Sequence, residues 1–155
     1  MTERDAPNIV VYPPFAALGA TVAAFALHMV WPVDILPKQG FINLSGWVAI
    51  GGALWLVSGA ARAFSGVGTP VSPRKTPMAL ATDGPFRSTR NPMYLGMVLA
   101  LIGIGFLGAI DWAVFSALAL WAVLHFGVVL REEAYLSQKF GHEYEAYMQQ
   151  TRRWF

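Results

Sequence analysis

Four long runs of hydrophobic residues, almost free of charge, dominate the pattern of the 155-residue chain. They extend over about residues 15–31, 44–64, 93–110 and 112–130. Each run has roughly the 20 residues that an α-helix needs to cross a hydrocarbon core about 30 Å thick. The pattern therefore predicts an all-α, polytopic membrane protein with four transmembrane helices, organised as a single domain over residues 1–155.

The third and fourth runs are separated only by Asp111. As one helix they would measure about 57 Å at about 1.5 Å per residue, which is far longer than one crossing. An Asp at the bilayer centre costs about 2.5–3.5 kcal/mol to insert, whereas in the headgroup region it costs little. We therefore expect a tight turn at Asp111 and an antiparallel hairpin of the third and fourth helices.

Composition supports a membrane protein, because 55% of the residues are hydrophobic and 13% are charged, against about 25% charged residues in soluble domains. The absence of Cys excludes disulfides and thiolate metal sites, and we expect no metal. The formal charge of +2 is small and the basic residues are scattered, so we expect no nucleic-acid partner.

Basic residues gather in the connection between the second and third runs and again after the fourth run. They are Arg62, Arg74, Lys75, Arg87, Arg90, Arg131, Lys139, Arg152 and Arg153. Positively charged connections favour the cytoplasmic side. The sequence therefore predicts a multi-pass protein with both termini in the cytoplasm, in the inner or plasma membrane if the source is bacterial.

The third run contains GIGFLG, residues 103–108, which matches the G-x-G-x-x-G loop that holds dinucleotide phosphates. That loop requires a strand before it and a βαβ unit around it, and neither is present in this hydrophobic run. One alternative is helix packing, because small residues allow membrane helices to approach closely. It would apply to Gly96, Gly103, Gly105 and Gly108. The other alternative, that some of these glycines contact a cofactor, stays open on this evidence.

The connection 65–91 is longer than the roughly 12–15 residues beyond which loops are usually functional or disordered. It ends in GPFRSTRNPMYLG, where Asn91 stands as an N-cap and Pro92 as the first helical residue. Arg90 beside a helix N-terminus forms a suitable seat for a carboxylate or phosphate. Alternatively, Arg87 and Arg90 only satisfy the positive-inside preference.

The fourth run ends in LHFGVVLREEAYL, which places Glu132 and Glu133 beside the start of the third run. His125 precedes Glu132 by seven residues, about two helical turns, so the two are expected on one helix face, with His125 about 10 Å deeper. An ionisable group in a membrane helix indicates a functional site. The alternative for His125 is a neutral imidazole hydrogen-bonded to a neighbouring helix.

The C-terminal segment 133–155 alternates charged and aromatic residues and is interrupted at Gly141. This pattern predicts an amphipathic cytoplasmic helix that acts as an interfacial lid. The alternative is a helix that lies on lipid and takes no part in a pocket, which we expect for the terminal RRWF. For Tyr144 and Tyr147 the two alternatives stay open.

In combination, GPFRSTRNPMYLG, the GxG of the third run, REEAYL and FGHEYEAYMQQTRRW resemble the integral-membrane methyltransferases that include isoprenylcysteine carboxyl methyltransferase and the phospholipid N-methyltransferases. The resemblance spans roughly residues 69–154. It implies S-adenosylmethionine as the cofactor, a lipophilic small-molecule or lipidated acceptor, and membrane lipid as a partner. The cofactor-binding residues that it implies are Arg90, Asn91, Pro92, Tyr94, Gly96, Gly103, Gly105, Glu132 and Glu133. Asn91 replaces the histidine of the eukaryotic carboxyl methyltransferases.

The resemblance assigns Arg90 to the methionine carboxylate, Glu132 and Glu133 to the ribose hydroxyls or the amino group, and Tyr94 to the pocket wall. Arg90, Glu132 and His125 are the candidate catalytic residues. Carboxylate O-methylation of the isoprenylcysteine type is the leading function, with phospholipid or amine N-methylation second, since an ammonium must first lose its proton to a base such as His125. The sterol reductases, which bind NADPH, and a non-catalytic membrane scaffold are the remaining alternatives.

Overall fold

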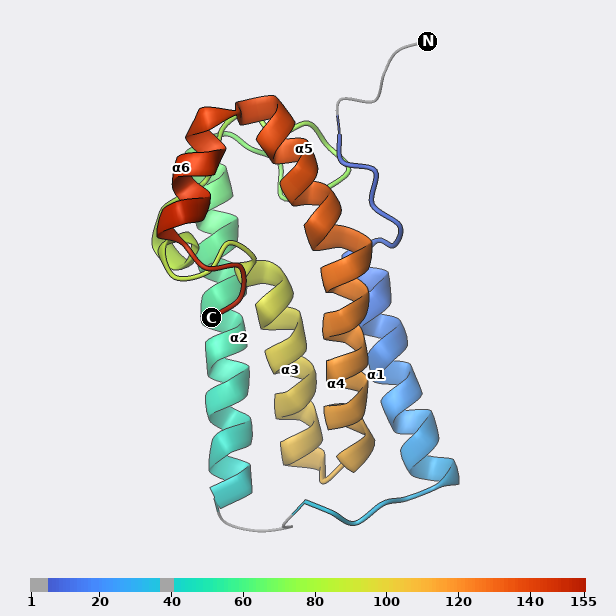
Figure 1. Cartoon of the computed structure of the whole chain (residues 1–155). Helices are drawn as coiled ribbons and strands as arrows, with labels where there is room; N and C mark the ends of the chain where they lie inside the picture. Colours follow the sequence, from blue (N-terminus) through green and yellow to red (C-terminus); the bar gives the residue numbers. More distant parts are fainter. Residues whose placement is uncertain (1–5, 37–40) are drawn as a thin grey trace.

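The computed structural model describes residues 6–36 and 41–155. Four helices form an antiparallel bundle: α1 (Pro13–Val30), α2 (Phe41–Gly66), α3 (Pro92–Gly108) and α4 (Asp111–Leu124). They pack in the spatial order α2, α3, α4, α1 (Figure 1). Within the described ranges the only β pairing is an isolated bridge between Thr89 and Arg152. The all-α prediction is confirmed.

The predicted runs agree with the helices to within a few residues, except at the end of the fourth. There the helix continues through a π-helical turn, η2 (His125–Val129), into α5 (Leu130–Phe140). Within residues 6–36 and 41–155, three helices are long and apolar enough to cross a membrane, Pro13–Val30, Ile42–Gly66 and Asp111–Phe140, and Pro92–Gly108 is a shorter apolar helix. The first part of the predicted C-terminal helix is thus a continuation of the fourth run.

The hairpin between α3 and α4 turns at Ala109 and Ile110, and Asp111 begins α4. Ala109 lies in the left-handed region, with φ of 51°. Asp111 is 2% exposed, and its Oδ1 accepts hydrogen bonds from the backbone N–H groups of Ile35 (2.9 Å) and Leu36 (2.6 Å). The expected turn is present, and Asp111 is buried there as an anchor for the connection between α1 and α2.

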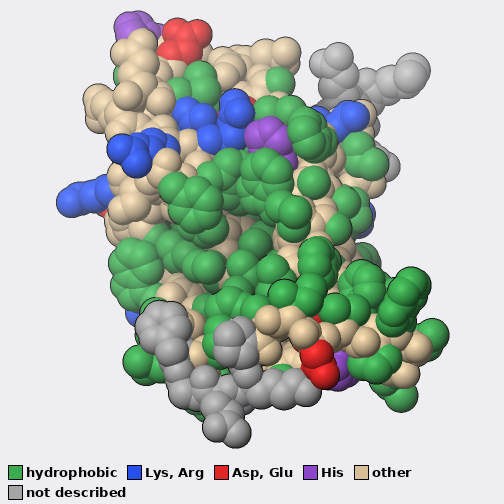
Figure 2. Space-filling view, turned by 60° about the horizontal axis from the view of Figure 1, so that its bottom comes forward, with side chains coloured by type: hydrophobic (Ala, Val, Ile, Leu, Met, Phe, Trp, Pro, Cys, Tyr) green, Lys and Arg blue, Asp and Glu red, His purple; other side chains and the backbone are tan. Residues whose placement is uncertain are grey.

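Large apolar side chains cover the outside of the bundle as well as filling its core. The core contains Leu101, Leu120 and Leu124, each 2% exposed or less, whereas Leu54 and Trp47 are about two-thirds exposed. Figure 2 shows hydrophobic side chains over much of the visible face of the spans. A helix that is apolar on all sides is typical of a membrane span, so the surface agrees with an integral membrane protein.

One end of the bundle is covered by polar structure, which we call the capped end (residues 67–91 and 130–155). It contains the short helix η1 (Gly84–Arg87), α5, and α6 (His142–Gln150) (Figure 1). Gly141 separates α5 from α6 with φ of 52°, a conformation that favours glycine. The break directs α6 back across the end of the bundle, so that it lies over the ends of the spans.

Candidate functional site

The connection between α2 and α3 folds onto the capped end around Thr69. The Thr69 hydroxyl donates to the carbonyl of Ala79 (2.8 Å) and accepts from the N–H groups of Met78 (3.2 Å) and Ala79 (3.0 Å). Thr69 is 7% exposed. One buried hydroxyl therefore closes this connection into a compact loop against the helices.

Beneath the loop lies a cavity of about 380 Å³, which we call the cavity throughout. Its walls come from the N-terminal segment, the α2–α3 connection, α3, α5 and α6. Six of the predicted site residues line it: Arg90, Asn91, Pro92, Tyr94, Glu132 and Glu133. The structure thus gathers residues that are more than 40 positions apart in the sequence.

Glu133 is the centre of an ion cluster in the wall of the cavity. Its Oε1 lies 2.9 Å from Nη2 of Arg90 and its Oε2 lies 2.7 Å from Nη2 of Arg153. The Nε of Arg153 also donates to both carboxylate oxygens at 3.0 Å. The side chains of Arg90 and Glu133 are each only 10% exposed. Glu133 is therefore saturated by two arginines, and its hydrogen bonds raise the pKa of Arg153 above its ordinary value.

Arg90 keeps one donor that no group of the described residues uses. Its Nη1 donates to the carbonyl of Met148 (3.2 Å) and its Nη2 pairs with Glu133, but its buried Nε has no hydrogen-bond partner among the described residues. Buried polar groups are rarely left unpaired in folded proteins. An unpaired donor in the wall of a cavity is a position where a ligand acceptor would gain a hydrogen bond.

Glu132 is held separately from Glu133. The hydroxyl of Tyr94 donates to Oε1 of Glu132 at 2.7 Å, which fixes the carboxylate against α3. Glu132 is half-buried and makes no ion pair with the two arginines within the described structure. The adjacent glutamates therefore have different environments, one neutralised by arginine and the other bonded to a phenol.

Residues 151–154, which we call the C-terminal strap, pair with the start of α3. The N–H of Arg90 donates to the carbonyl of Arg152 (2.9 Å). The hydroxyl of Thr89 (3.1 Å) and Nδ2 of Asn91 (3.0 Å) both donate to the carbonyl of Arg153. Asn91 stands at the N-cap as expected, but its side chain makes no capping hydrogen bond. The side chain instead binds the strap through the carbonyl of Arg153.

Two tyrosines of α6 complete the cavity wall. The hydroxyl of Tyr147 donates to the carbonyl of Phe86 (2.7 Å) and so joins α6 to η1. Burial raises the pKa of Tyr147 to about 12, although the positive charge of Arg90 opposes the shift. Burial likewise raises the pKa of Tyr144 above its usual range. Both phenols line the cavity and remain neutral at ordinary pH, so α6 contributes to the cavity and is not only a lipid-facing helix.

The three predicted glycines of α3 lie at helix contacts and not in the cavity lining. A Cβ on Gly96 would lie 2.7 Å from Cγ2 of Val57, and one on Gly103 would lie 2.8 Å from Cγ1 of Ile50, both on α2. A Cβ on Gly105 would lie 2.6 Å from Cβ of Ala113 on α4. These positions correspond to the helix-packing alternative, because only a residue without a side chain allows this approach.

His125 is placed differently from the expectation. It is not among the residues that line the cavity; its ring stacks on Trp121 at 5.3 Å, and its Nδ1 accepts a hydrogen bond from Nε1 of Trp154 at 3.2 Å. A π-helical turn begins at His125 and interrupts the α-helical register on which the expected shared face was based, and of the two residues only Glu132 lines the cavity. The imidazole is hydrogen-bonded, but its partner Trp154 belongs to the strap and not to a neighbouring helix, as the alternative had expected.

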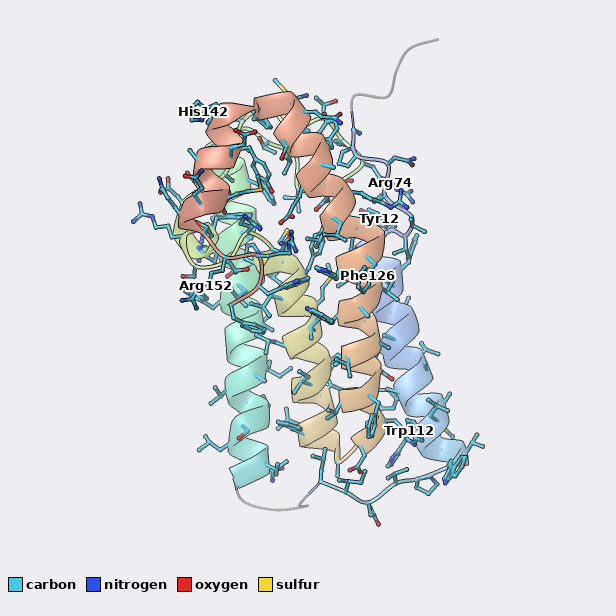
Figure 3. All side chains as sticks on the ribbon, viewed as in Figure 1. Tyr12, Arg74, Trp112, Phe126, His142 and Arg152 are labelled. Atoms are coloured by element: carbon cyan, nitrogen blue, oxygen red, sulfur yellow. The ribbon has the colours of Figure 1, made fainter. Side chains whose placement is uncertain are left out.

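Sequence reasoning missed the strap. Its last residues were expected on lipid, yet Trp154 is 8% exposed and Arg153 pairs with Glu133. The available signal was charge, since REE supplies acids and RRW supplies bases, and a buried acid requires a basic partner. Tyr12 was also missed; it lines the cavity, and Arg74 lies 4.7 Å above its ring (Figure 3).

The fold and the site together define an integral-membrane protein with a charged cavity at one end of an apolar helical bundle. The family model described as phospholipid methyltransferase matches residues 41–143, which is more than half of the chain. The chain therefore belongs to this family of membrane methyltransferases. Comparison with curated proteins and with solved structures gave no match.

Proposed function

We propose that the protein transfers a methyl group from S-adenosylmethionine to a lipophilic acceptor at the capped end. The observation that supports this most is the presence of both charge signs, Arg90 and Glu132, in one cavity where the apolar spans meet the polar cap. S-adenosylmethionine carries a carboxylate, an ammonium group and ribose hydroxyls, so it needs acceptors and donors together. A lipophilic acceptor reaches the same level from the membrane.

The residues that would hold the cofactor differ in their roles. Arg90 would bind the methionine carboxylate, since its Nε has no hydrogen-bond partner in the part of the chain that the structure describes. Glu132, positioned by Tyr94, would accept from the amino group or the ribose hydroxyls. Glu133 would hold Arg90 in place and would not contact the cofactor, because both of its oxygens bind arginine. Asn91 and Pro92 would shape the wall at the start of α3.

When bound, S-adenosylmethionine supplies an electrophilic methyl group on a sulfonium sulfur. The protein then needs to provide approach geometry and electrostatics and no metal or covalent intermediate. Tyr144, Tyr147 and the folded α2–α3 connection would exclude water from this reaction. Arg90 and Glu132 would orient the two ends of the cofactor so that the reactive carbon faces the acceptor.

For the acceptor we favour a carboxylate of the isoprenylcysteine type. A carboxylate attacks in its ionised form and needs no base, and His125, the base expected for an amine acceptor, does not line the cavity. The second candidate is N-methylation of a phospholipid amine, which the family description favours. In that reaction Glu132 would take the proton. With either acceptor, we expect the cavity and both termini in the cytoplasm, where the soluble cofactor is available.

Cofactor binding is tested by isothermal titration of the detergent-solubilised protein with S-adenosylhomocysteine and, separately, with NADPH. We expect binding of the former only. Glu132→Gln should weaken it by at least about tenfold, because a hydrogen bond to a charged group contributes about 1.5–3 kcal/mol. Glu143→Gln, at an exposed position of α6, is the matched control. Tight binding of NADPH without S-adenosylhomocysteine would instead support the reductase alternative.

The acceptor is tested by incubating membranes that contain the protein with cofactor labelled in the methyl group. A carboxyl methyl ester releases labelled methanol in alkali, whereas an N-methyl group is stable. We expect alkali-labile label in the lipid-soluble fraction. Alkali-stable label in phospholipid would establish the second candidate, and absence of any transfer by a protein that binds S-adenosylhomocysteine would contradict both acceptors.

A further inference from the structure

A second hollow, which we call the outer hollow, opens on the other side of the C-terminal strap. It has a volume of about 390 Å³, and none of its lining residues lines the cavity. Its apolar wall contains Leu56, Leu95 and Trp154, and its polar rim contains Arg87 and Arg152. The hollow is therefore amphipathic, with apolar span residues on one side and two guanidinium groups on the other.

The strap determines which arginine faces which site. Thr151, at its start, has extended backbone, with φ of −127° and ψ of 133°, and the strap bridges to Thr89. Successive side chains of extended chain point to opposite sides. Arg153 accordingly pairs with Glu133 at the cavity, while Arg152 lines the outer hollow.

The hollow carries positive charge that the protein does not neutralise. Arg152 is exposed, and none of the ion pairs found in residues 6–36 and 41–155 involves it. Arg87 pairs with Asp83 at 2.8 Å, but both side chains are about three-quarters exposed, so water and salt screen this pair. Gln150 and Ser88 add polar side chains to the rim. The chemistry suits a phosphate group.

The position of the hollow indicates where that phosphate comes from. Lys and Arg side chains gather above the hydrophobic surface in Figure 2, and Figure 3 places Arg152 beside α2 where α6 ends. This is the boundary between apolar spans and polar cap, which is the level of lipid phosphates. Basic pockets at this level bind anionic headgroups, and Arg side chains reach toward them.

We propose that the outer hollow binds the phosphate headgroup of an anionic phospholipid between Arg87 and Arg152. The acyl chains of this lipid lie along the apolar surface below Leu56 and Leu95. The lipid is a bound structural partner and not the methyl acceptor, because the strap separates the hollow from the cavity. This lipid site does not depend on which reaction takes place in the cavity.

The test is native mass spectrometry of the detergent-solubilised protein titrated with phosphatidylglycerol or with phosphatidylcholine of the same chains. We expect preferential retention of phosphatidylglycerol. Arg87→Gln and Arg152→Gln should each weaken it about fivefold, and the double variant about 25-fold, as expected for one basic residue at a membrane surface. Arg152→Lys should retain most of the affinity, and Arg131→Gln, exposed elsewhere on the capped end, should leave it unchanged.

Equal binding of the two lipids would overturn the proposal. So would a double variant that keeps the affinity for phosphatidylglycerol, or an equal loss in Arg131→Gln, which would indicate a general effect of surface charge. Folding of each variant is checked by its thermal unfolding in detergent. Because the strap binds Thr89 and Arg90 through backbone carbonyls, changes at the Arg152 side chain leave those hydrogen bonds in place.

Discussion

Glu133 and Arg153 are joined by three short hydrogen bonds although 20 residues separate them in the chain. Nε and Nη2 of the guanidinium approach the carboxylate together, at 2.7–3.0 Å, which is a two-pronged arginine–carboxylate geometry. The same carboxylate binds Arg90 at the start of α3. One acid thus connects α5, the strap and α3, so the cavity wall depends on the position of the chain end.

Glu133→Gln should destabilise the protein strongly. The substitution leaves Arg90 buried without its counter-charge, and breaking a buried ion pair costs about 3–5 kcal/mol. We expect a clear fall in the thermal unfolding midpoint in detergent. Glu143→Gln is the matched control and should change little. An unchanged midpoint for Glu133→Gln would mean that the cluster does not support the fold.

Arg153→Ala should loosen the strap while the bundle stays folded. Arg153 is 39% exposed, so solvent screens its pair, and we expect a cost of only about 1 kcal/mol. Hydrogen exchange followed by mass spectrometry should show faster exchange in residues 150–155 and at Arg90, whose N–H is bonded to the strap. Arg152→Gln should leave exchange there unchanged. Equal rates in Arg153→Ala and the native protein would contradict the strap's dependence on Glu133.

Gly103→Ala should lower stability through a clash at the α2–α3 contact. The new Cβ would lie 2.8 Å from Ile50 and 3.0 Å from the carbonyl of Gly46, and overpacking of this kind costs about 1–3 kcal/mol. Gly51→Ala, where a Cβ would have nothing within 4 Å, is the control. If Gly103→Ala kept native stability but lost affinity for S-adenosylhomocysteine, the cofactor role of this glycine would replace the packing role.

Deprotonation of Tyr147 should lower the stability of the folded protein at alkaline pH. Its pKa in the folded protein is about 12, above the ordinary value near 10, so the folded state holds this proton more tightly than the unfolded state. The contribution is complete below pH 10 and is lost as pH rises toward 12. Denaturant midpoints measured from pH 9 to 11.5 should decline more steeply for the native protein than for Tyr147→Phe. Parallel declines would show that Tyr147 is exposed.

The sequence alone determined the helices and the broad content of the site. Hydrophobic length is a local property, so the spans were predictable to within a few residues. Arg90 and the two glutamates could be placed near one another because α3 and α4 are antiparallel partners and all three residues stand at the same end. The amphipathic C-terminal segment and its break at Gly141 were also visible as a local pattern.

Tertiary structure decided which of these groups contact one another. A π-helical turn begins at His125, which periodicity could not reveal, and His125 contacts Trp121 and Trp154 and does not line the cavity. That Glu133 pairs with a second arginine, Arg153, while Glu132 bonds to Tyr94, depends on the contact of the strap with the start of α3. The glycines of α3 acquire their packing role only against Ile50, Val57 and Ala113 of other helices. Such long-range contacts leave no periodic trace in sequence, because each partner is an ordinary residue in its own segment.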